Sequence, residues 1–336
     1  MVKKSVSICF ALLLGVLLVS CQNQSPRVQD YYPITEDEKY SYVGAGNEYA
    51  SYTVVTDYAA ENKVQRRIDN GGTVRVEVVE VSDGKVSRVF GQPETYYREN
   101  FLEKESNLQE VLLMEPIVEG TSWELADGSV RTITGVSVPV ETPSGDYSAV
   151  AVETEGETGK TIDYYAKDVG LVKSVAIGDG YEVSAELSER LDNTPFVQPV
   201  RFYYPNGSEA RIYYKDKEVS FRTNDEPAAV LAASYQEDFA GKPGDVFSPG
   251  TKINSCYLNQ DDVVCLDLSR EFLTGMNAGA AYEALILQCM ANTFGSYYQQ
   301  NKMALTIDGA PYASGHFELK PGEYLTVNLE KAEEIK

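Results

Sequence analysis

Histidine and basic side chains are scarce in this chain, and each scarcity excludes a class of function. Histidine occurs once, at His316, so a two-histidine zinc motif such as His-Glu-x-x-His is impossible, and no Gly-x-Ser-x-Gly nucleophile motif occurs. Lysine and arginine number 29 against 51 acidic residues, which gives a formal net charge of −22. Proteins bind nucleic acid mainly through Lys and Arg, so the sign of the charge excludes nucleic-acid binding. We expect a protein that is not an enzyme, with no catalytic residue, no metal and no cofactor.

Long apolar runs are also scarce. The segment Ile8–Ser20 is the one candidate for a signal peptide or a membrane-spanning helix. It follows Lys3 and Lys4, and at about 13 residues it is shorter than the roughly 20 residues that span a bilayer, so it predicts a signal peptide over residues 1–20. The residues that end it, Leu18-Val19-Ser20-Cys21, resemble the lipobox of bacterial lipoproteins, in which the cysteine thiol accepts the lipid. We therefore expect an extracytoplasmic protein, lipid-anchored to the cell membrane through Cys21. The alternative is an ordinary secretory signal with an incidental cysteine, which also exports the protein.

Cysteine is rare after this segment, where Cys256, Cys265 and Cys289 are left without metal-ligand spacing. Cys256 and Cys265 lie on two apolar runs separated by a polar turn. A turn on Gln260-Asp261 would place the two thiols face to face, close enough for a disulfide. A turn on Asp261-Asp262 would make them diagonal neighbours only. The sequence leaves both registers open, so Cys256–Cys265 is a candidate disulfide, while Cys289 is expected to be a small buried residue.

The first half of the mature chain has the pattern of β-strands. After a polar tether over residues 21–33, residues 34–190 contain short runs rich in Val, Thr, Ile and Tyr. Val74, Val76 and Val78 alternate with polar residues, as expected for a strand with one buried face. Turn-forming pairs separate the runs: Asn70-Gly71, Asp83-Gly84, Asp127-Gly128, Ser144-Gly145 and Asp179-Gly180. We predict an antiparallel β domain built as a curved sheet or partial barrel.

The second half has a different composition. Residues 191–199, with Pro195 and Pro199, are predicted to be a linker, followed by an α+β domain over residues 200–330. Its first helix is expected around residues 228–233, with Asn224 or Asp225 as the N-cap, and its second over residues 278–294. The second helix contains one charge, so we expect it to be covered on more than one side.

This second region resembles a known family in six ordered segments over residues 198–329. The segments are Val200-Arg201-Phe202-Tyr203-Tyr204, Pro249-Gly250-Thr251-Lys252-Ile253, Leu266-Asp267-Leu268-Ser269, Asn292-Thr293-Phe294, Ile307-Asp308-Gly309 and Gly315-His316. Together they are similar to the GerMN domain of GerM-type sporulation and germination lipoproteins of spore-forming Gram-positive bacteria. The first region, with Gly120-Thr121-Ser122-Trp123 and the segment Tyr164–Lys173, resembles the β-rich domain that precedes a GerMN domain in similar lipoproteins.

The resemblance implies a non-enzymatic protein that contacts other envelope or sporulation proteins, with no catalytic residues to transfer. It makes His316 a structural residue of the family pattern. The alternative is a module that binds peptidoglycan or another wall glycan, which the tyrosine doublets suggest because exposed rings can stack on sugars; an envelope hydrolase is a third possibility. We expect core packing to explain most doublets. They are Tyr31-Tyr32, Tyr96-Tyr97, Tyr164-Tyr165, Tyr203-Tyr204, Tyr213-Tyr214 and Tyr297-Tyr298.

Overall fold

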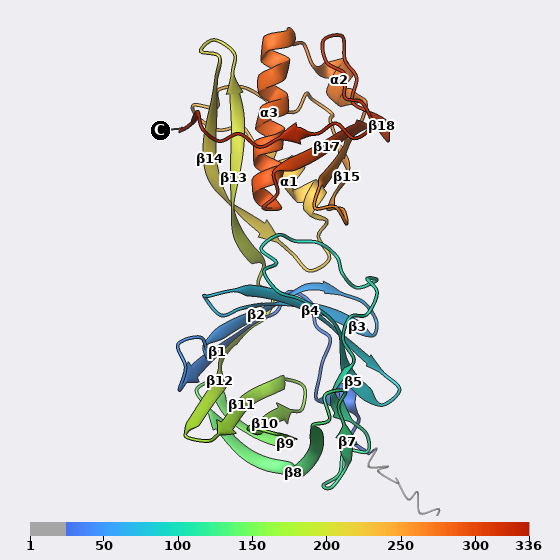
Figure 1. Ribbon diagram of the computed structural model, residues 1–336. Helices are drawn as coiled ribbons and strands as arrows, with labels where there is room; N and C mark the ends of the chain where they lie inside the picture. Colours follow the sequence, from blue (N-terminus) through green and yellow to red (C-terminus); the bar gives the residue numbers. More distant parts are fainter. Residues whose placement is uncertain (1–24, 336) are drawn as a thin grey trace, which may run out of the picture.

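The computed structural model describes residues 25–335. The expected signal peptide and the lipidation site Cys21 lie outside the described residues. Two regions are stacked end to end, an all-β region at the bottom of Figure 1 and an α+β region at the top. Within residues 25–335 the longest helices are too short or too polar to cross a lipid bilayer.

The β region is a 12-stranded antiparallel sheet in the order β6-β5-β4-β3-β2-β1-β12-β11-β10-β9-β8-β7. The chain steps outward from β1 to one edge at β6, crosses to the other edge at β7 and returns to β12 beside β1. Its elements are η1 (Val28–Asp30), β1 (Lys39–Ala45), β2 (Tyr52–Ala59), β3 (Lys63–Asp69), β4 (Val74–Ser82), β5 (Lys85–Gln92), β6 (Glu110–Met114), β7 (Ser122–Glu124), β8 (Val130–Thr142), β9 (Gly145–Gly156), β10 (Gly159–Ala166), β11 (Gly170–Gly178) and β12 (Tyr181–Leu191). The predicted β region and its hairpin turns are confirmed, because all five turn pairs lie at or next to hairpin connections.

The sheet curves until its two edge strands face each other, as the arc in the lower half of Figure 1 shows. Side chains bridge the edges: the Trp123 Nε1–H of β7 donates to the Val111 carbonyl of β6 at 3.0 Å, and Arg131 Nη1 of β8 donates to the same carbonyl at 2.6 Å. Arg131 Nη2 also lies 2.6 Å from Glu110 Oε1. Side chains therefore join the two edges at this seam, so the predicted curved sheet is confirmed.

The predicted tether over residues 21–33 is wrong for its last residues. Val28, Tyr31 and Tyr32 are buried in the core of the β region, and the Val28 N–H donates to Glu115 Oε1 at 3.0 Å. The reason is hydrophobic: the concave side of a curved sheet needs apolar side chains to fill it, and this segment supplies them.

The α+β region contains two sheets, β13-β14-β20 and β15-β16-β17-β18, with β19 paired to β17. The strands β16 and β17 are parallel and are connected through the helices α2 and α3. The elements are β13 (Phe196–Asn206), β14 (Arg211–Phe221), α1 (Pro227–Gln236), β15 (Ile253–Leu258), β16 (Val264–Leu268), α2 (Glu271–Gly275), α3 (Ala280–Tyr297), β17 (Lys302–Ile307), β18 (Ala310–Pro311), β19 (Leu325–Thr326) and β20 (Ala332–Glu334). The predicted α+β character is confirmed.

Both predicted helices are present. The helix α3 is packed between β13 on one side and β17 and β19 on the other, so the expectation of cover on several sides is confirmed (Figure 1). The predicted N-cap of α1 is wrong, because Glu226 occupies that position. The Asn224 side chain instead accepts the Ala59 N–H at 2.9 Å, and Asp225 accepts the Arg222 N–H at 2.7 Å.

The segment 191–199, expected as a linker, is a strand in its second half. Residues 196–199 form the start of β13 and pair with residues 218–221 of β14. Pro199 is tolerated because β13 is an edge strand of its sheet. The two regions also share one hydrophobic core, in which Tyr58, Phe90 and Phe101 of the β region join the core of the α+β region. The junction is therefore part of a continuous hydrophobic core.

Candidate functional site

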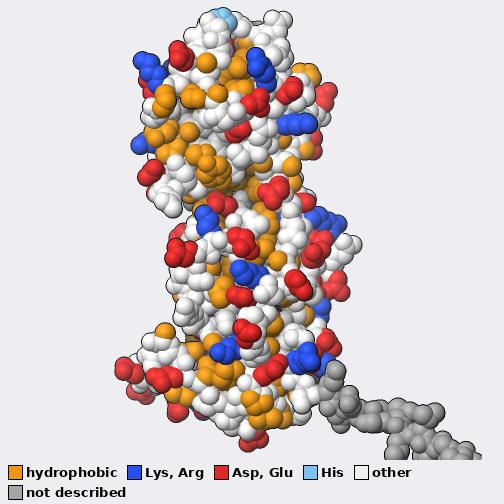
Figure 2. Space-filling model, turned by 90° about the vertical axis from the view of Figure 1, so that its right-hand side faces the viewer, with side chains coloured by type: hydrophobic (Ala, Val, Ile, Leu, Met, Phe, Trp, Pro, Cys, Tyr) orange, Lys and Arg blue, Asp and Glu red, His pale blue; other side chains and the backbone are white. Residues whose placement is uncertain are grey.

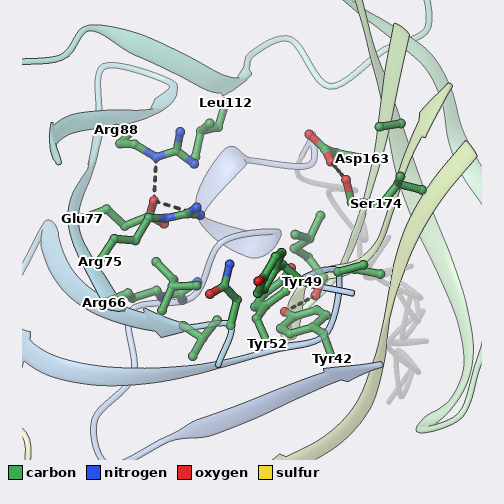
Figure 3. Close-up of a pocket in the computed structure, with 18 of the residues that line it drawn as sticks. Tyr42, Tyr49, Tyr52, Arg66, Arg75, Glu77, Arg88, Leu112, Asp163 and Ser174 are labelled. Carbon is green, nitrogen blue, oxygen red and sulfur yellow. Dashed lines mark hydrogen bonds and ion pairs between the residues drawn. The ribbon is translucent and has the colours of Figure 1, made fainter. Parts of the chain in front are cut away.

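The concave face of the β region encloses a cavity of about 400 Å³ (Figure 3). This volume lies within the range of roughly 300–1,000 Å³ that small-molecule sites have. Side chains alternate between the two faces of a strand, and β3, β4 and β5 direct Arg66, Glu77 and Arg88 to this face. Arg66 and Glu77 are opposite each other in the sheet, and Arg88 is opposite Val79. Charged residues are rarely buried in a sheet core without a partner. Their position identifies the cavity as a candidate binding site.

Most of these charges form a connected network. Arg88 Nε lies 2.7 Å from Glu77 Oε2, and Arg88 Nη1 lies 2.5 Å from Glu110 Oε2. Glu110 also contacts Arg131, the residue that bridges the seam. Arg75 Nη2 lies 4.0 Å from Glu77 Oε2 at the more exposed side of the network. Three guanidinium groups thus share two carboxylates.

Arg66 differs from its neighbours because it has no acidic partner within the described residues. Its side chain is nine-tenths buried, its Nη2 donates to the Pro33 carbonyl at 3.3 Å, and its Nε has no hydrogen-bond partner. The Tyr32 ring lies 4.4 Å and the Tyr40 ring 5.8 Å from its guanidinium carbon. Burial alone would lower the pKa of Arg66, but the surrounding tyrosine hydroxyls and Glu77 raise it on balance, so the group stays charged.

Tyrosine side chains form another part of the cavity wall. The Tyr42 and Tyr52 rings are stacked with centroids 4.5 Å apart, and the Tyr42 hydroxyl donates to the Leu171 carbonyl at 2.8 Å. Tyr49, in the loop between β1 and β2, is 52% exposed and lies over Gly72 of the turn between β3 and β4. A Cβ at Gly72 would come within 2.7 Å of the Tyr49 ring, so glycine is what allows the two loops to meet at the rim of the cavity.

Two polar side chains lie on the opposite wall, as Figure 3 shows. Asp163 of β10 accepts a hydrogen bond of 2.6 Å from the Ser174 hydroxyl of β11. Burial raises the pKa of Asp163, because a carboxylate loses solvation in the cavity, while the bond from Ser174 opposes that effect. The wall therefore combines aromatic faces with hydrogen-bonding groups.

A second buried ion cluster joins the two regions. Asp57 is fully buried, with Oδ2 at 2.8 Å from Arg67 Nη2 and Oδ1 at 3.1 Å from Arg98 Nη1. Arg98 Nη2 also donates to the Arg222 carbonyl of the α+β region at 2.7 Å, and the Arg98 N–H donates to the Tyr297 hydroxyl at 3.0 Å. This cluster is structural, because every group in it is satisfied by the protein.

His316 lies in a loop of the α+β region against Glu283 of α3. Its Nδ1 is 2.8 Å from Glu283 Oε2, and the Tyr312 hydroxyl donates to Glu283 Oε1 at 2.6 Å. Glu283 is buried, which alone would raise its pKa, but hydrogen bonds from Ser314, Tyr312 and His316 lower it. The arrangement fits the structural role expected for His316. Across residues 25–335 we find no cluster of three or more His, Cys, Asp or Glu side chains able to hold a metal ion.

The candidate disulfide between Cys256 and Cys265 is not formed, and both thiols are free. Cys256 pairs with Leu266, and Cys265 pairs with Tyr257. Because side chains alternate across a strand, this register places the two cysteines on opposite faces of the hairpin. Neither register considered from the sequence occurs, since the connecting loop has an odd number of residues and is centred on Asp261. Burial raises the pKa of Cys256 to about 12.

One face of the sheet β15–β16–β17 is only half-buried, whereas the other packs against the core. Alternate residues of β16 and β17 point to this open sheet face. It carries Tyr257, Cys265, Asp267, Ala304 and Thr306. Figure 2, which shows the side of the molecule that includes β15 and β18, has hydrophobic side chains gathered on the α+β region. Charged side chains are spread more evenly over the β region.

The tyrosine doublets mainly serve core packing, as expected. Both rings are buried in Tyr31-Tyr32, Tyr203-Tyr204 and Tyr297-Tyr298. Tyr203-Tyr204 differs from a usual strand pair because β13 is covered on both faces, and the Tyr204 ring packs against Tyr235 of α1 with centroids 5.7 Å apart. Sequence reasoning missed the cavity residues Arg66 and Glu77. They could have been found in the sequence as charged residues two positions away from buried valines, because Arg66 shares a strand face with Val64 and Glu77 shares one with Val79.

Comparison with known proteins assigns the α+β region. Residues 201–313 match the family model described as "Germane: Sporulation and spore germination". Among solved structures, the tandem GerMN domains of the sporulation protein GerM from Bacillus subtilis are 15% identical, with 40% of this chain and 46% of that chain covered and a TM-score of 0.29. The first GerMN domain of the same protein is 18% identical, with 37% of this chain and 94% of that chain covered and a TM-score of 0.28. No curated protein matches the chain.

A further solved structure matches about half of the chain. A protein of Bacteroides fragilis, described as exported and as having a YmcC-like fold, is 13% identical, with 48% of this chain and 99% of that chain covered and a TM-score of 0.34. The assignment of the α+β region rests on the family model. Residues 201–313 form a Germane domain. The family model thus agrees with the resemblance of this region to the GerMN domain of sporulation and germination proteins.

Proposed function

We propose that this protein is a lipoprotein, anchored outside the cytoplasm through Cys21, that acts without catalysis by docking its Germane domain on other envelope or sporulation proteins. The observation that carries the proposal is the Germane match over residues 201–313. The family is described by a cellular process and not by a reaction, which favours a binding role.

The arrangement of the regions supports this proposal. The described chain begins at the lower end of the β region, and the Germane domain lies at the opposite end (Figure 1). An anchor at Cys21 would therefore hold the β region next to the membrane and present the Germane domain away from it. The shared core and the Asp57 cluster make the β region a stiff spacer.

The open sheet face is the surface we propose for docking. Tyr257 is 46% exposed there, and Cys265 and Ala304 lie beside it. An exposed aromatic ring with small neighbours and polar groups beside it has the composition of a protein interface.

The experiment compares two matched tyrosine variants in sporulating cells of the native host. Tyr257→Arg places a charge on the open sheet face, and Tyr181→Arg is the control, because Tyr181 is 52% exposed in the β region. We expect in-cell crosslinking to capture envelope proteins with the wild type and the control, and to lose them with Tyr257→Arg. Equal capture by all three proteins, or unchanged sporulation and germination after gene deletion, would contradict the proposal.

The alternative partner, peptidoglycan, has weaker support because five of the six tyrosine doublets have at least one ring buried in the core. Incubation of the purified chain with isolated sacculi separates the two roles. Protein docking predicts that the chain stays in solution, whereas a wall-binding module would sediment with the sacculi.

A further inference from the structure

We propose that the cavity of the β region binds a small sugar acid, a single pyranose ring that carries a carboxylate. The carboxylate would pair with Arg66, and the ring would lie against the tyrosine wall. This inference concerns the β region and is independent of the docking role proposed for the Germane domain.

The environment of Arg66 indicates that the ligand is negatively charged. A buried guanidinium without an anionic partner is costly, and the usual solution is a carboxylate that accepts two parallel N–H bonds. Arg66 has one long bond to a carbonyl and an Nε without a partner among residues 25–335, while the neighbouring Arg88 and Arg131 are paired with Glu110. In a chain with a net charge of −22, the cavity is lined by more arginines than acids. A ligand anion would complete this set of charges.

The other residues that line the cavity indicate that the ligand contains a sugar ring. An alkyl chain would strip water from Asp163 and Glu77 without replacing their hydrogen bonds. Sugar hydroxyls donate and accept, so they can satisfy these carboxylates and Ser174. The C–H face of a pyranose is apolar and packs well on an aromatic ring such as Tyr52. The cavity therefore suits a molecule with one anionic group, several hydroxyls and one apolar face.

The cavity also offers a place to enter. Tyr49 is 52% exposed at the rim, and the side chain of Arg75, which also lines the cavity, is 54% exposed. Both belong to the ends of the hairpins β1–β2 and β3–β4, which lie over the cavity. Arg66 is 8% exposed and Tyr52 is half-buried, so both are less accessible than these two side chains. A ligand that enters here would reach Arg66 with its carboxylate first and leave its ring under Tyr49.

Isothermal titration of the purified mature chain tests the proposal with three probes. D-glucuronate has both the ring and the carboxylate, D-glucose has the same ring without the carboxylate, and acetate has the carboxylate alone. We expect saturable binding of glucuronate and roughly tenfold or greater weakening for each of the other two, because each loses one half of the recognition. No saturable binding of glucuronate, or equal binding of glucose, would overturn the proposal.

Variants locate the site. Arg66→Met should weaken glucuronate binding roughly tenfold or more. The control is Arg201→Met, which removes an exposed arginine paired with Asp216 in the other region and should leave binding unchanged. If Arg66→Met does not fold, the unaltered protein still gives an answer by NMR. The Arg66 Nε–H resonance should shift with glucuronate and not with glucose, and an unmoved resonance under saturating glucuronate would refute the site.

Discussion

The two regions of this molecule fill the space beside their sheets in different ways. The Germane domain places a helix between its sheets, and α3 fills that space with Cys289, Met290 and Phe294, all fully buried. The β region has no long helix in its described part, so its curved sheet encloses a space that strands alone do not fill. Charged and tyrosine side chains line that space. A helix packed between two sheets therefore fills the core with apolar side chains. Where a curved sheet has no such helix, a cavity remains that polar side chains can line.

The largest expected loss of stability is at the junction, where a single substitution should uncouple the unfolding of the two regions. Asp57→Ala leaves Arg67 and Arg98 buried without their carboxylate, so it should lower the free energy of unfolding by about 3–5 kcal/mol. Chemical denaturation monitored by circular dichroism measures this loss. The wild type should unfold in one transition because the regions share a core, and the variant should show two.

The matched control is Asp216→Ala, which breaks an exposed ion pair with Arg201 in the Germane domain. Exposed pairs contribute about 0–1 kcal/mol, so this variant should remain close to the wild type. Similar losses for the two aspartate variants would show that the buried cluster does not hold the regions together.

A smaller effect is expected at the seam of the curved sheet. Arg131→Met removes the hydrogen bonds to Val111 and Thr154 and the ion pair with Glu110, and should cost roughly 1.5–3 kcal/mol. Amide hydrogen exchange should accelerate in β6 and β7 and stay unchanged in α3. Lys160→Met, which breaks a half-exposed pair with Glu153 in the same region, is the control. Uniform acceleration through both regions would argue against a local seam.

The smallest effect concerns pH and affects the Germane domain alone. The folded-state pKa of Glu283 lies below its ordinary value of 4.5, because hydrogen bonds from Ser314, Tyr312 and His316 outweigh the effect of burial. Its stabilising contribution is therefore complete above pH 4.5 and is lost as the pH falls through the lower folded-state pKa. Thermal unfolding from neutral to acidic pH should show a shallower acid loss for Glu283→Gln than for the wild type. The same slope for Glu283→Gln and for the exposed Glu318→Gln would contradict this assignment.

Sequence patterns predicted the elements well where local chemistry decides them. Asp83-Gly84 and Asp179-Gly180 form two-residue hairpin turns because both positions of such turns favour Gly or Asp with positive φ, and Asp83 and both glycines adopt it. Helix propensity predicts α1, and the single charge in α3 predicts that this helix is covered on more than one side. The ordered segments of residues 198–329 predicted the family correctly.

Long-range contacts explain what sequence patterns missed. The alternation in β4 predicted one buried face, but the two edges of the curved sheet meet at the seam and enclose Glu77 in a cavity, and residue spacing within one strand does not show which strands meet. Likewise, Asn224 was expected to cap a helix and instead binds β2 of the other region. The register between Cys256 and Cys265 depends on whether the connecting loop has an even or an odd number of residues. The spacing of apolar residues does not determine that number.

The neighbouring positions of β1 and β12 have a consequence for how the molecule can be rebuilt. Lys39 pairs with Leu191, so the chain enters and leaves the 12-stranded sheet at the same point, next to the Germane domain. Residues 39–191 thus behave like a cassette inserted into a nearly continuous path. A shorter or longer module placed between residues 38 and 192 would set a different height above the bilayer for the Germane domain, provided that it supplies the contacts that Tyr58, Phe101 and Arg98 make with that domain.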